Sequence, residues 1–317
     1  MAMRPYFSRE NCVTAKPTRL VYVALTTAVG IWGAGFAVGK YALHEISPLH
    51  VLAGSGVFAA ATQVIWTVAR GGLGRLRLPR RRALAVVALS FSGQNLSYGL
   101  TYLGLAYTTA TNAAILYAFT PTLMAVLGTL FLRERLNSGK LLGAVGGFLG
   151  VALIITQGRL SSLRFEGMLI GNLIIFGAVT YWSSYSVLTR WVTRNIPADA
   201  YSFYVLALGS TAPIAWVWVA HHRFPLSGLQ SGTLWALAFL GAGAGTLAMN
   251  CWNWGLSKVE AARAGMFSYL EPVFASAVAF LFLGERFTLP SFGGALLVLA
   301  SIFAATQIGE APSHVQE

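Results

Sequence analysis

Ten long apolar segments separated by short polar stretches dominate the pattern of the chain. They cover residues 20–43, 48–69, 83–104, 109–132, 138–157, 166–189, 200–221, 232–255, 261–283 and 289–308. Each has about the length that an α-helix needs to cross the hydrocarbon core of a bilayer, roughly 20 residues. The pattern therefore predicts an all-α integral membrane protein with ten transmembrane helices.

The second half of the chain repeats the first half. Residues 96–136 and 247–287 align without a gap at an offset of 151. Apolar bias alone does not supply matched glycine, proline and charged positions. The matched positions include Gly104 and Gly255, Pro121 and Pro272, Glu134 and Glu285, and Arg135 and Arg286.

Each half contains five predicted helices, and this odd number decides how the halves are related. The second half must enter the membrane from the opposite side, which is the inverted repeat found in many transporters. We therefore expect two inverted five-helix repeats around a central cavity. The expected divisions are an N-terminal tail at 1–19, repeats at 20–157 and 158–308, and a C-terminal tail at 309–317.

Composition agrees with a membrane protein and offers no catalytic motif. The chain is 56% hydrophobic and 10% charged, whereas soluble domains carry about 25% charged residues. Cys12 and Cys251 are far apart and form no metal-ligand spacing. The sequence has no nucleotide-binding glycine loop and no paired carboxylates for hydrolysis. We therefore expect no enzyme activity, no metal and no cofactor.

Basic residues set the expected orientation. With the N-terminus in the cytoplasm, 17 of the 22 Lys and Arg residues fall on the cytoplasmic side, as the positive-inside rule requires. The net charge of +12 then reflects contact with anionic lipid, chiefly through the loop at 70–82, and not nucleic-acid binding. We expect an inner-membrane protein with both termini in the cytoplasm, present as a monomer.

Polar and aromatic side chains recur at helical spacing inside five of the apolar segments. Gln94, Tyr98 and Tyr102 share one face by their i, i+4 steps. Trp32 and Trp182 match at an offset of 150 and lie too deep for interfacial anchors. Such groups mark a pathway or serve helix–helix hydrogen bonds. The predicted substrate-binding residues are Trp32, Gln94, Tyr98, Tyr102, Tyr117, Trp182, Tyr185, Asn250, Trp254, Ser268 and Glu271.

Glu271 is an acid far from either end of its apolar segment. An ionised carboxylate is costly there, so we expect it to be protonated unless a cation approaches. It would carry a coupling proton, pair with a substrate amine, or only hydrogen-bond to a neighbouring helix. Pro121 and Pro272 interrupt backbone hydrogen bonds. Glu134 and Glu285, each beside an arginine, are predicted to form structural ion pairs or interfacial anchors.

The repeated proline and Glu-Arg positions resemble the drug/metabolite transporter superfamily and, within it, the EamA-type ten-helix exporters. The pattern is Pro121 to Arg133-Glu134-Arg135 in the first copy and Pro272 to Gly284-Glu285-Arg286 in the second. The resemblance implies alternating access by a uniporter, an exchanger or a proton-coupled carrier. Family substrates include amino acids, other metabolites, nucleotide sugars and drugs.

The expected function is secondary transport, in the exporting direction, of small metabolites. The aromatic walls favour amino acids, including aromatic ones, and other metabolites or drugs are the alternative. A membrane enzyme acting on lipid would place its polar cluster near one interface, whereas these polar groups are central. A channel would need a continuous polar pore in place of glycine-packed helices.

The charge distribution predicts that the loop at 70–82 faces the cytoplasm. In a background without the two native cysteines, Leu76→Cys should resist a membrane-impermeant maleimide in intact cells and react after permeabilisation. Ser162→Cys, on the opposite side, should react in intact cells. Labelling of position 76 in intact cells would reverse the predicted orientation.

Overall fold

The computed structural model describes residues 18–71, 76, 78, 80–156, 168–221, 228–283 and 288–307. Within these ranges every regular element is helical, so the all-α class is confirmed. Glu285 and both chain tails lie outside the described residues. The elements are α1 Arg19–Ala42, α2 Pro48–Ala69, α3 Arg80–Tyr107, α4 Ala110–Tyr117, α5 Thr120–Leu132, α6 Ser138–Thr156, α7 Leu169–Thr193, α8 Ala198–Phe203, η4 Tyr204–Leu208, α9 Thr211–His221, α10 Ser231–Ala238, η5 Phe239–Leu247, α11 Ala248–Lys258, α12 Ala261–Met266, η6 Phe267–Tyr269, α13 Leu270–Leu283 and α14 Leu289–Gln307.

These elements group into ten helical stretches across the described residues, at the predicted places. Six stretches are long and apolar enough to cross a membrane by length and composition, and the number of transmembrane helices otherwise stays a prediction. The long helices α3 and α7 are not among the six, because polar and aromatic side chains lower their mean hydropathy. These two helices pack against each other inside the bundle.

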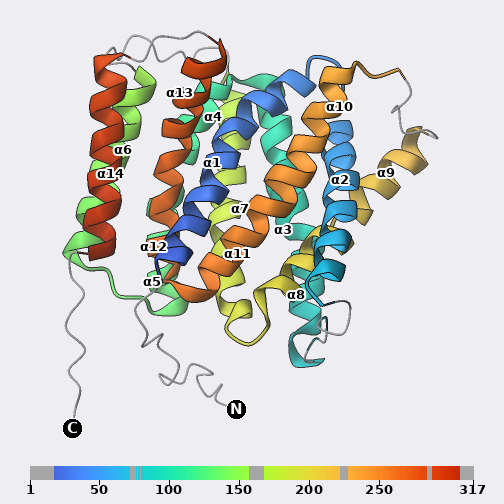
Figure 1. Cartoon of the computed structure of the whole chain (residues 1–317), viewed down its shortest axis with the longest axis horizontal. Helices are drawn as coiled ribbons and strands as arrows, with labels where there is room; N and C mark the ends of the chain where they lie inside the picture. The colour runs from blue at the N-terminus through green and yellow to red at the C-terminus, as the bar shows by residue number, and fades with distance from the viewer. Residues whose placement is uncertain are drawn as a thin grey trace.

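The two halves run through the bundle in opposite directions. In Figure 1, α1 rises from the lower end, whereas α7 descends from the upper end. α1 therefore begins, and α14 ends, at the same end of the bundle. The element bounds themselves recur, since α1, α3 and α6 correspond to α7, the α10–α11 stretch and α14 at offsets of 150 or 151.

Two of the predicted helices are interrupted directly before a residue pair that ends in proline. The fourth segment divides into α4 and α5, with the break directly before Thr120-Pro121. The ninth divides into α12 and α13 through the 3₁₀ turn η6, directly before Glu271-Pro272. Proline cannot donate a hydrogen bond to the carbonyl one turn earlier, so a helix loosens there. The breaks lie where Pro121 and Pro272 were expected to interrupt backbone hydrogen bonds.

Glycines on α6 and α14 let these two helices touch along their length. A Cβ atom at Gly150 would lie 2.8 Å from the carbonyl oxygen of Gly294, and one at Gly294 would lie 2.6 Å from the carbonyl oxygen of Gly150. Helices in lipid associate through such close backbone approach, because lipid tails remove most of the hydrophobic driving force.

Basic side chains close two helix ends at equivalent positions of the halves. The Lys40 ammonium donates to the carbonyl oxygens of Leu105 at 2.5 Å and Thr108 at 3.0 Å, at the end of α3. Arg190 donates to the carbonyl oxygen of Leu256 at 2.8 Å, near the end of α11. The last carbonyls of a helix lack partners within it and favour a cation.

The contact between α6 and α14 predicts that Gly150→Ala destabilises the protein. The added methyl group would press on the backbone of α14, at a cost of about 1–3 kcal/mol. Gly177→Ala is the matched control, because a Cβ there meets nothing within 4 Å. Thermal unfolding in detergent should show a lower melting temperature for Gly150→Ala only. Equal melting temperatures would contradict this packing.

Candidate functional site

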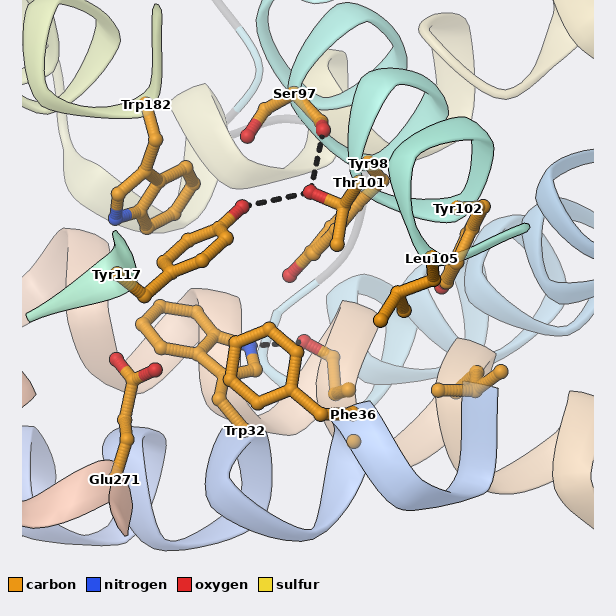
Figure 2. A pocket seen from close by; sticks show the side chains of 13 residues that line it. Trp32, Phe36, Ser97, Tyr98, Thr101, Tyr102, Leu105, Tyr117, Trp182 and Glu271 are labelled. Carbon is orange, nitrogen blue, oxygen red and sulfur yellow. Dashed lines mark hydrogen bonds between the residues drawn. The ribbon is translucent and has the colours of Figure 1, made fainter. Parts of the chain in front are cut away.

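A cavity lies between helices from both halves of the chain (Figure 2). α1, α3, α4 and α7 surround it together with η5 and the first turn of α13. Six of its residues are aromatic, and Glu271 brings a carboxylate into an otherwise apolar and hydroxyl-bearing wall. The lining consists of Trp32, Gly35, Phe36, Ser97, Tyr98, Thr101, Tyr102, Leu105, Tyr117, Trp182, Leu240, Ala244 and Glu271.

Helical spacing explains how the side chains reach the cavity. On α1, Trp32 and Phe36 are four residues apart and therefore share a face. On α3, Tyr98, Thr101 and Tyr102 follow the same rule. Trp32 stands near the middle of its helix and not at its ends, so the cavity lies within the bundle.

The two tryptophans that match between the halves meet at the cavity. The rings of Trp32 and Trp182 lie 5.1 Å apart at an angle of 88°, an edge-to-face contact. Tyr98 stands 6.4 Å from Trp182 on the other side. Aromatic rings at these separations attract each other beyond simple burial. The inverted arrangement thus brings equivalent positions of α1 and α7 together.

A π-helical segment supplies the partner of the Trp32 indole. The indole Nε1 donates to the carbonyl oxygen of Ala244 at 3.0 Å, within η5. The wider register of a π-helix disturbs the regular backbone pairing and leaves carbonyls available for such contacts. The Trp32 donor is therefore occupied, while the faces of its ring remain for a ligand.

A chain of hydroxyl groups crosses one wall. Thr101 donates to the carbonyl oxygen of Ser97 at 2.8 Å, and its oxygen lies 2.7 Å from the Tyr117 hydroxyl. Because the single Thr101 proton is used on Ser97, Tyr117 must be the donor in the second contact. The Tyr117 oxygen consequently faces the cavity as an acceptor (Figure 2).

Glu271, Tyr98 and Ser97 are the polar side chains of the wall that the helices themselves use least. The Glu271 carboxylate points toward Tyr117 and Trp32 (Figure 2), and the residue is only 5% exposed. The hydroxyl of Ser268, one turn earlier, lies beside it. The Tyr98 hydroxyl is buried and has no hydrogen-bond partner among the described residues.

Six of the predicted substrate-binding residues line this cavity: Trp32, Tyr98, Tyr102, Tyr117, Trp182 and Glu271. The other described candidates are not part of the lining. The ring of Tyr185 lies 5.6 Å from that of Trp182 at a tilt of 31°, and Trp254 packs against the hydrophobic core.

Asn250 also serves the interior of the bundle. Its amide donates to Gln63 at 2.7 Å and to the carbonyl oxygen of Thr246 at 2.8 Å. The side chain of Gln94 lies outside the described part of the structure. Sequence reasoning missed Phe36, although it follows Trp32 by four residues, and missed Leu240 and Ala244, for which the sequence carries no polar signal.

The free space inside the cavity is small. Its volume is about 50 Å³, enough for a few water molecules. A metabolite with a ring would have to push the aromatic side chains apart. The site is therefore contracted, and its size alone does not select a ligand.

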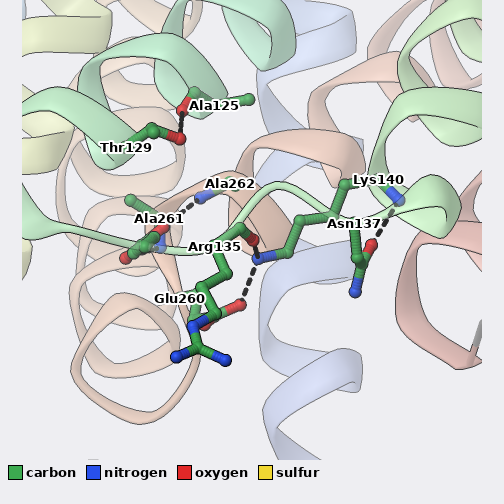
Figure 3. Close-up of polar contacts among 9 residues, drawn as sticks. Ala125, Thr129, Arg135, Asn137, Lys140, Glu260, Ala261 and Ala262 are labelled. Atoms are coloured by element: carbon green, nitrogen blue, oxygen red, sulfur yellow. Dashed lines mark hydrogen bonds and ion pairs between the residues drawn. The ribbon is translucent and has the colours of Figure 1, made fainter. Parts of the chain in front are cut away.

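Polar contacts join the two halves at the end of the bundle where α1 begins (Figures 1 and 3). The carboxylate of Glu134, between α5 and α6, accepts hydrogen bonds from the N–H groups of Ala261 at 2.8 Å and Ala262 at 3.1 Å. These N–H groups open α12 and lack partners within it. Glu134 was predicted to form a structural ion pair or an interfacial anchor, and here its carboxylate caps the start of α12. Burial raises the pKa of Glu134, and the two N–H groups oppose that shift.

Lys140 strengthens the same junction from the first turn of α6. Its ammonium is 3% exposed and lies 2.6 Å from the carboxylate of Glu260, which is 40% exposed. It also donates to the carbonyl oxygen of Arg135 at 2.6 Å (Figure 3). Because the Glu260 carboxylate is partly exposed to solvent, the ion pair itself stabilises the protein only weakly. We refer to Glu134, Lys140 and Glu260 together as the junction cluster.

Apolar helices around a partly polar central cavity define a membrane transporter, and the comparisons with known proteins agree. The sequence model of the EamA-like transporter family matches residues 19–156 and again residues 169–307. This chain belongs to that family. Its relatives include the uncharacterized transporter YyaM of Bacillus subtilis, 26% identical over 294 residues, which are 93% of this chain and 96% of YyaM.

Other relatives are more distant in sequence or inform only the fold. An uncharacterized transporter of Archaeoglobus fulgidus is 26% identical over 90% of this chain and 96% of its own length. A probable terminal-alkyne amino-acid exporter of Streptantibioticus cattleyicolor is 23% identical over 70% of this chain and 72% of its own. A solved crystal structure superposes with a TM-score of 0.76 at 20% identity, covering 92% of this chain and 97% of that one.

The geometry of the junction cluster predicts a stability order for substitutions at Glu134. Glu134→Ala should destabilise the protein by about 0.5–2 kcal/mol, because the first N–H groups of α12 lose their acceptor. Glu134→Gln retains one acceptor oxygen and should cost less. Melting temperatures of the purified variants in detergent test the order, and an unchanged Glu134→Ala protein would show that the cap contributes nothing.

Proposed function

We propose that this protein is a secondary transporter that exports small amine-bearing metabolites, with amino acids as the class that the sequence predicts. The observation that carries the proposal is the cavity between helices of both halves. Its aromatic rings cover apolar parts of a solute, and the Glu271 carboxylate attracts an amine. A site shared by two inverted halves can be opened from either side in turn.

Alternating access is supported by the way the cavity is enclosed. The junction cluster ties the α5–α6 loop to the start of α12, and so it holds the two halves together at one end. Substrate reaching the cavity from that end has to separate these contacts. Only Glu260 of the three side chains is substantially exposed, at 40%, so its ion pair with Lys140 costs little to break. The two buried hydrogen bonds of Glu134 are the contacts that opening has to replace.

The substrate class and the orientation in the membrane are supported by separate observations. The amino-acid class is supported by the name of the Streptantibioticus cattleyicolor relative, a probable terminal-alkyne amino-acid exporter. The cytoplasmic position of both termini is supported by the shared end at which α1 begins and α14 ends, together with the basic residues there. We propose a monomer in the bacterial inner membrane, without enzymatic activity.

The cavity predicts that Trp182→Ala impairs transport while the protein stays folded. Loss of a large ring from the wall should lower the rate of solute counterflow in proteoliposomes by about tenfold or more. Trp235→Ala is the matched control, because that tryptophan is 76% exposed on the outer surface of the bundle. It should transport like the unmodified protein.

The measurement is uptake of labelled amino acids and amines into proteoliposomes that contain the purified full-length chain. Saturable and solute-selective uptake supports a carrier, whereas linear uptake of many ions would indicate a channel. Normal counterflow by a folded Trp182→Ala variant would place the pathway elsewhere.

A further inference from the structure

The cavity wall presents a ligand with hydrogen-bond acceptors more than donors. Among the described residues of the lining, Glu271 is the carboxyl group, and in its ionised form, which an approaching cation favours, it is negative. The six aromatic rings add negatively polarised faces, which attract a cation. Both kinds of surface favour a ligand with a positive pole.

The donors of the wall are largely occupied by the protein itself. The Trp32 indole N–H is bound to the carbonyl oxygen of Ala244. The Thr101 proton is bound to the carbonyl oxygen of Ser97, and the Tyr117 proton to Thr101. What these groups leave toward the cavity is ring faces and oxygen lone pairs.

Besides Ser97, whose hydroxyl is also buried without a partner among the described residues, Tyr98 is a polar group of the lining whose partner the protein leaves open. Its hydroxyl oxygen is buried without a hydrogen-bond partner among the described residues, and Figure 2 shows it pointing toward the middle of the cavity. A buried hydroxyl without a partner loses free energy, so it gains from a ligand group that fills the gap. An ammonium group, with three donors and no acceptor, matches both this oxygen and the Glu271 carboxylate.

We propose that the cavity binds a monocationic amine with an aromatic or branched apolar body, and that it prefers this amine to the corresponding amino acid. The ammonium lies between the Glu271 carboxylate and the Tyr98 oxygen, and the apolar body lies against Trp32 and Trp182. The inference rests on the proposed function, because it names the substrate class of the same cavity.

The carboxylate of an amino acid would be unfavourable in this place. It is attached one carbon away from the ammonium, so it would stand close to Glu271 and be repelled by it. Entering the apolar wall, it would also lose its water, and the hydroxyls of Ser97 and Tyr98 are the donors that the wall leaves to replace it. A protonated Glu271 would behave in the opposite way, since it could donate to a substrate carboxylate.

Three molecules with the same phenylethyl body separate these cases. 2-Phenylethylamine has the amine alone, L-phenylalanine has the amine and the carboxylate, and 3-phenylpropionate has the carboxylate alone. Their affinities for the purified full-length protein are measured in detergent by calorimetry. Counterflow of each labelled compound is then measured in proteoliposomes.

We expect 2-phenylethylamine to bind about tenfold or more tightly than L-phenylalanine, and 3-phenylpropionate to bind weakest. Glu271→Gln should weaken amine binding about tenfold or more, and Tyr98→Phe should weaken it less. Neutral 2-phenylethanol should bind the unmodified protein and Glu271→Gln equally. Asp199→Asn, a carboxylate-to-amide change away from the cavity, should bind the amine normally.

Even if a variant fails to fold, the affinities of the three ligands for the unmodified protein decide whether the preference for amines holds. Equal or tighter binding of L-phenylalanine would overturn the preference for amines and leave transport standing. Unchanged amine affinity in a folded Glu271→Gln variant, with loss of pH-driven accumulation only, would overturn the ammonium site in favour of a proton site. Absence of counterflow for every solute tested, amino acids included, would overturn the transport function itself.

Discussion

The main physical constraint on this chain is that backbone polar groups in hydrocarbon must find partners within the protein. Several of its helices end or break inside the bundle, and each end exposes such groups. The few charged side chains meet this need: Lys40 and Arg190 at the ends of α3 and α11, and Glu134 at the start of α12. These charged side chains therefore serve helix ends. Lys40 and Arg190 do so within their own halves, whereas Glu134 joins the α5–α6 loop of one half to α12 of the other.

The cavity follows from the same arrangement of halves. Because α1 and α7 are equivalent and run in opposite directions, their matching tryptophans meet near the middle of the bundle. The halves differ at one position of the cavity wall. Glu271 lies in the first turn of α13, whereas the equivalent residue in the first turn of α5 is Thr120. One carboxyl group then acts within a wall of rings in which most donors are already bound, while the hydroxyls of Ser97 and Tyr98 are not. This asymmetry gives the cavity a polarity that two identical halves could not produce.

Sequence patterns predicted those features that depend on a single helix. The lengths of apolar runs located the helical stretches, and i, i+4 spacing identified the cavity face of α3. These patterns could not predict contacts between helices that are far apart in the sequence. Asn250 was assigned to the cavity, but its partner Gln63 lies on a helix far away in sequence. Glu134 was predicted to form a structural ion pair or an interfacial anchor, and its carboxylate binds N–H groups 127 and 128 residues further on.

The π-helical segment η5 has a consequence for how a carrier built in this way responds to its two compartments. α3 and the α10–α11 stretch contain 28 residues each, but only the second is wound partly as a π-helix, which turns α11 away from its equivalent orientation. Tyr98 therefore faces the cavity, whereas the equivalent residue Met249 is buried in the core. A solute arriving from one side meets different contacts from a solute arriving from the other. The half-saturation concentrations on the two faces of the membrane then differ, while the equilibrium distribution of the solute does not.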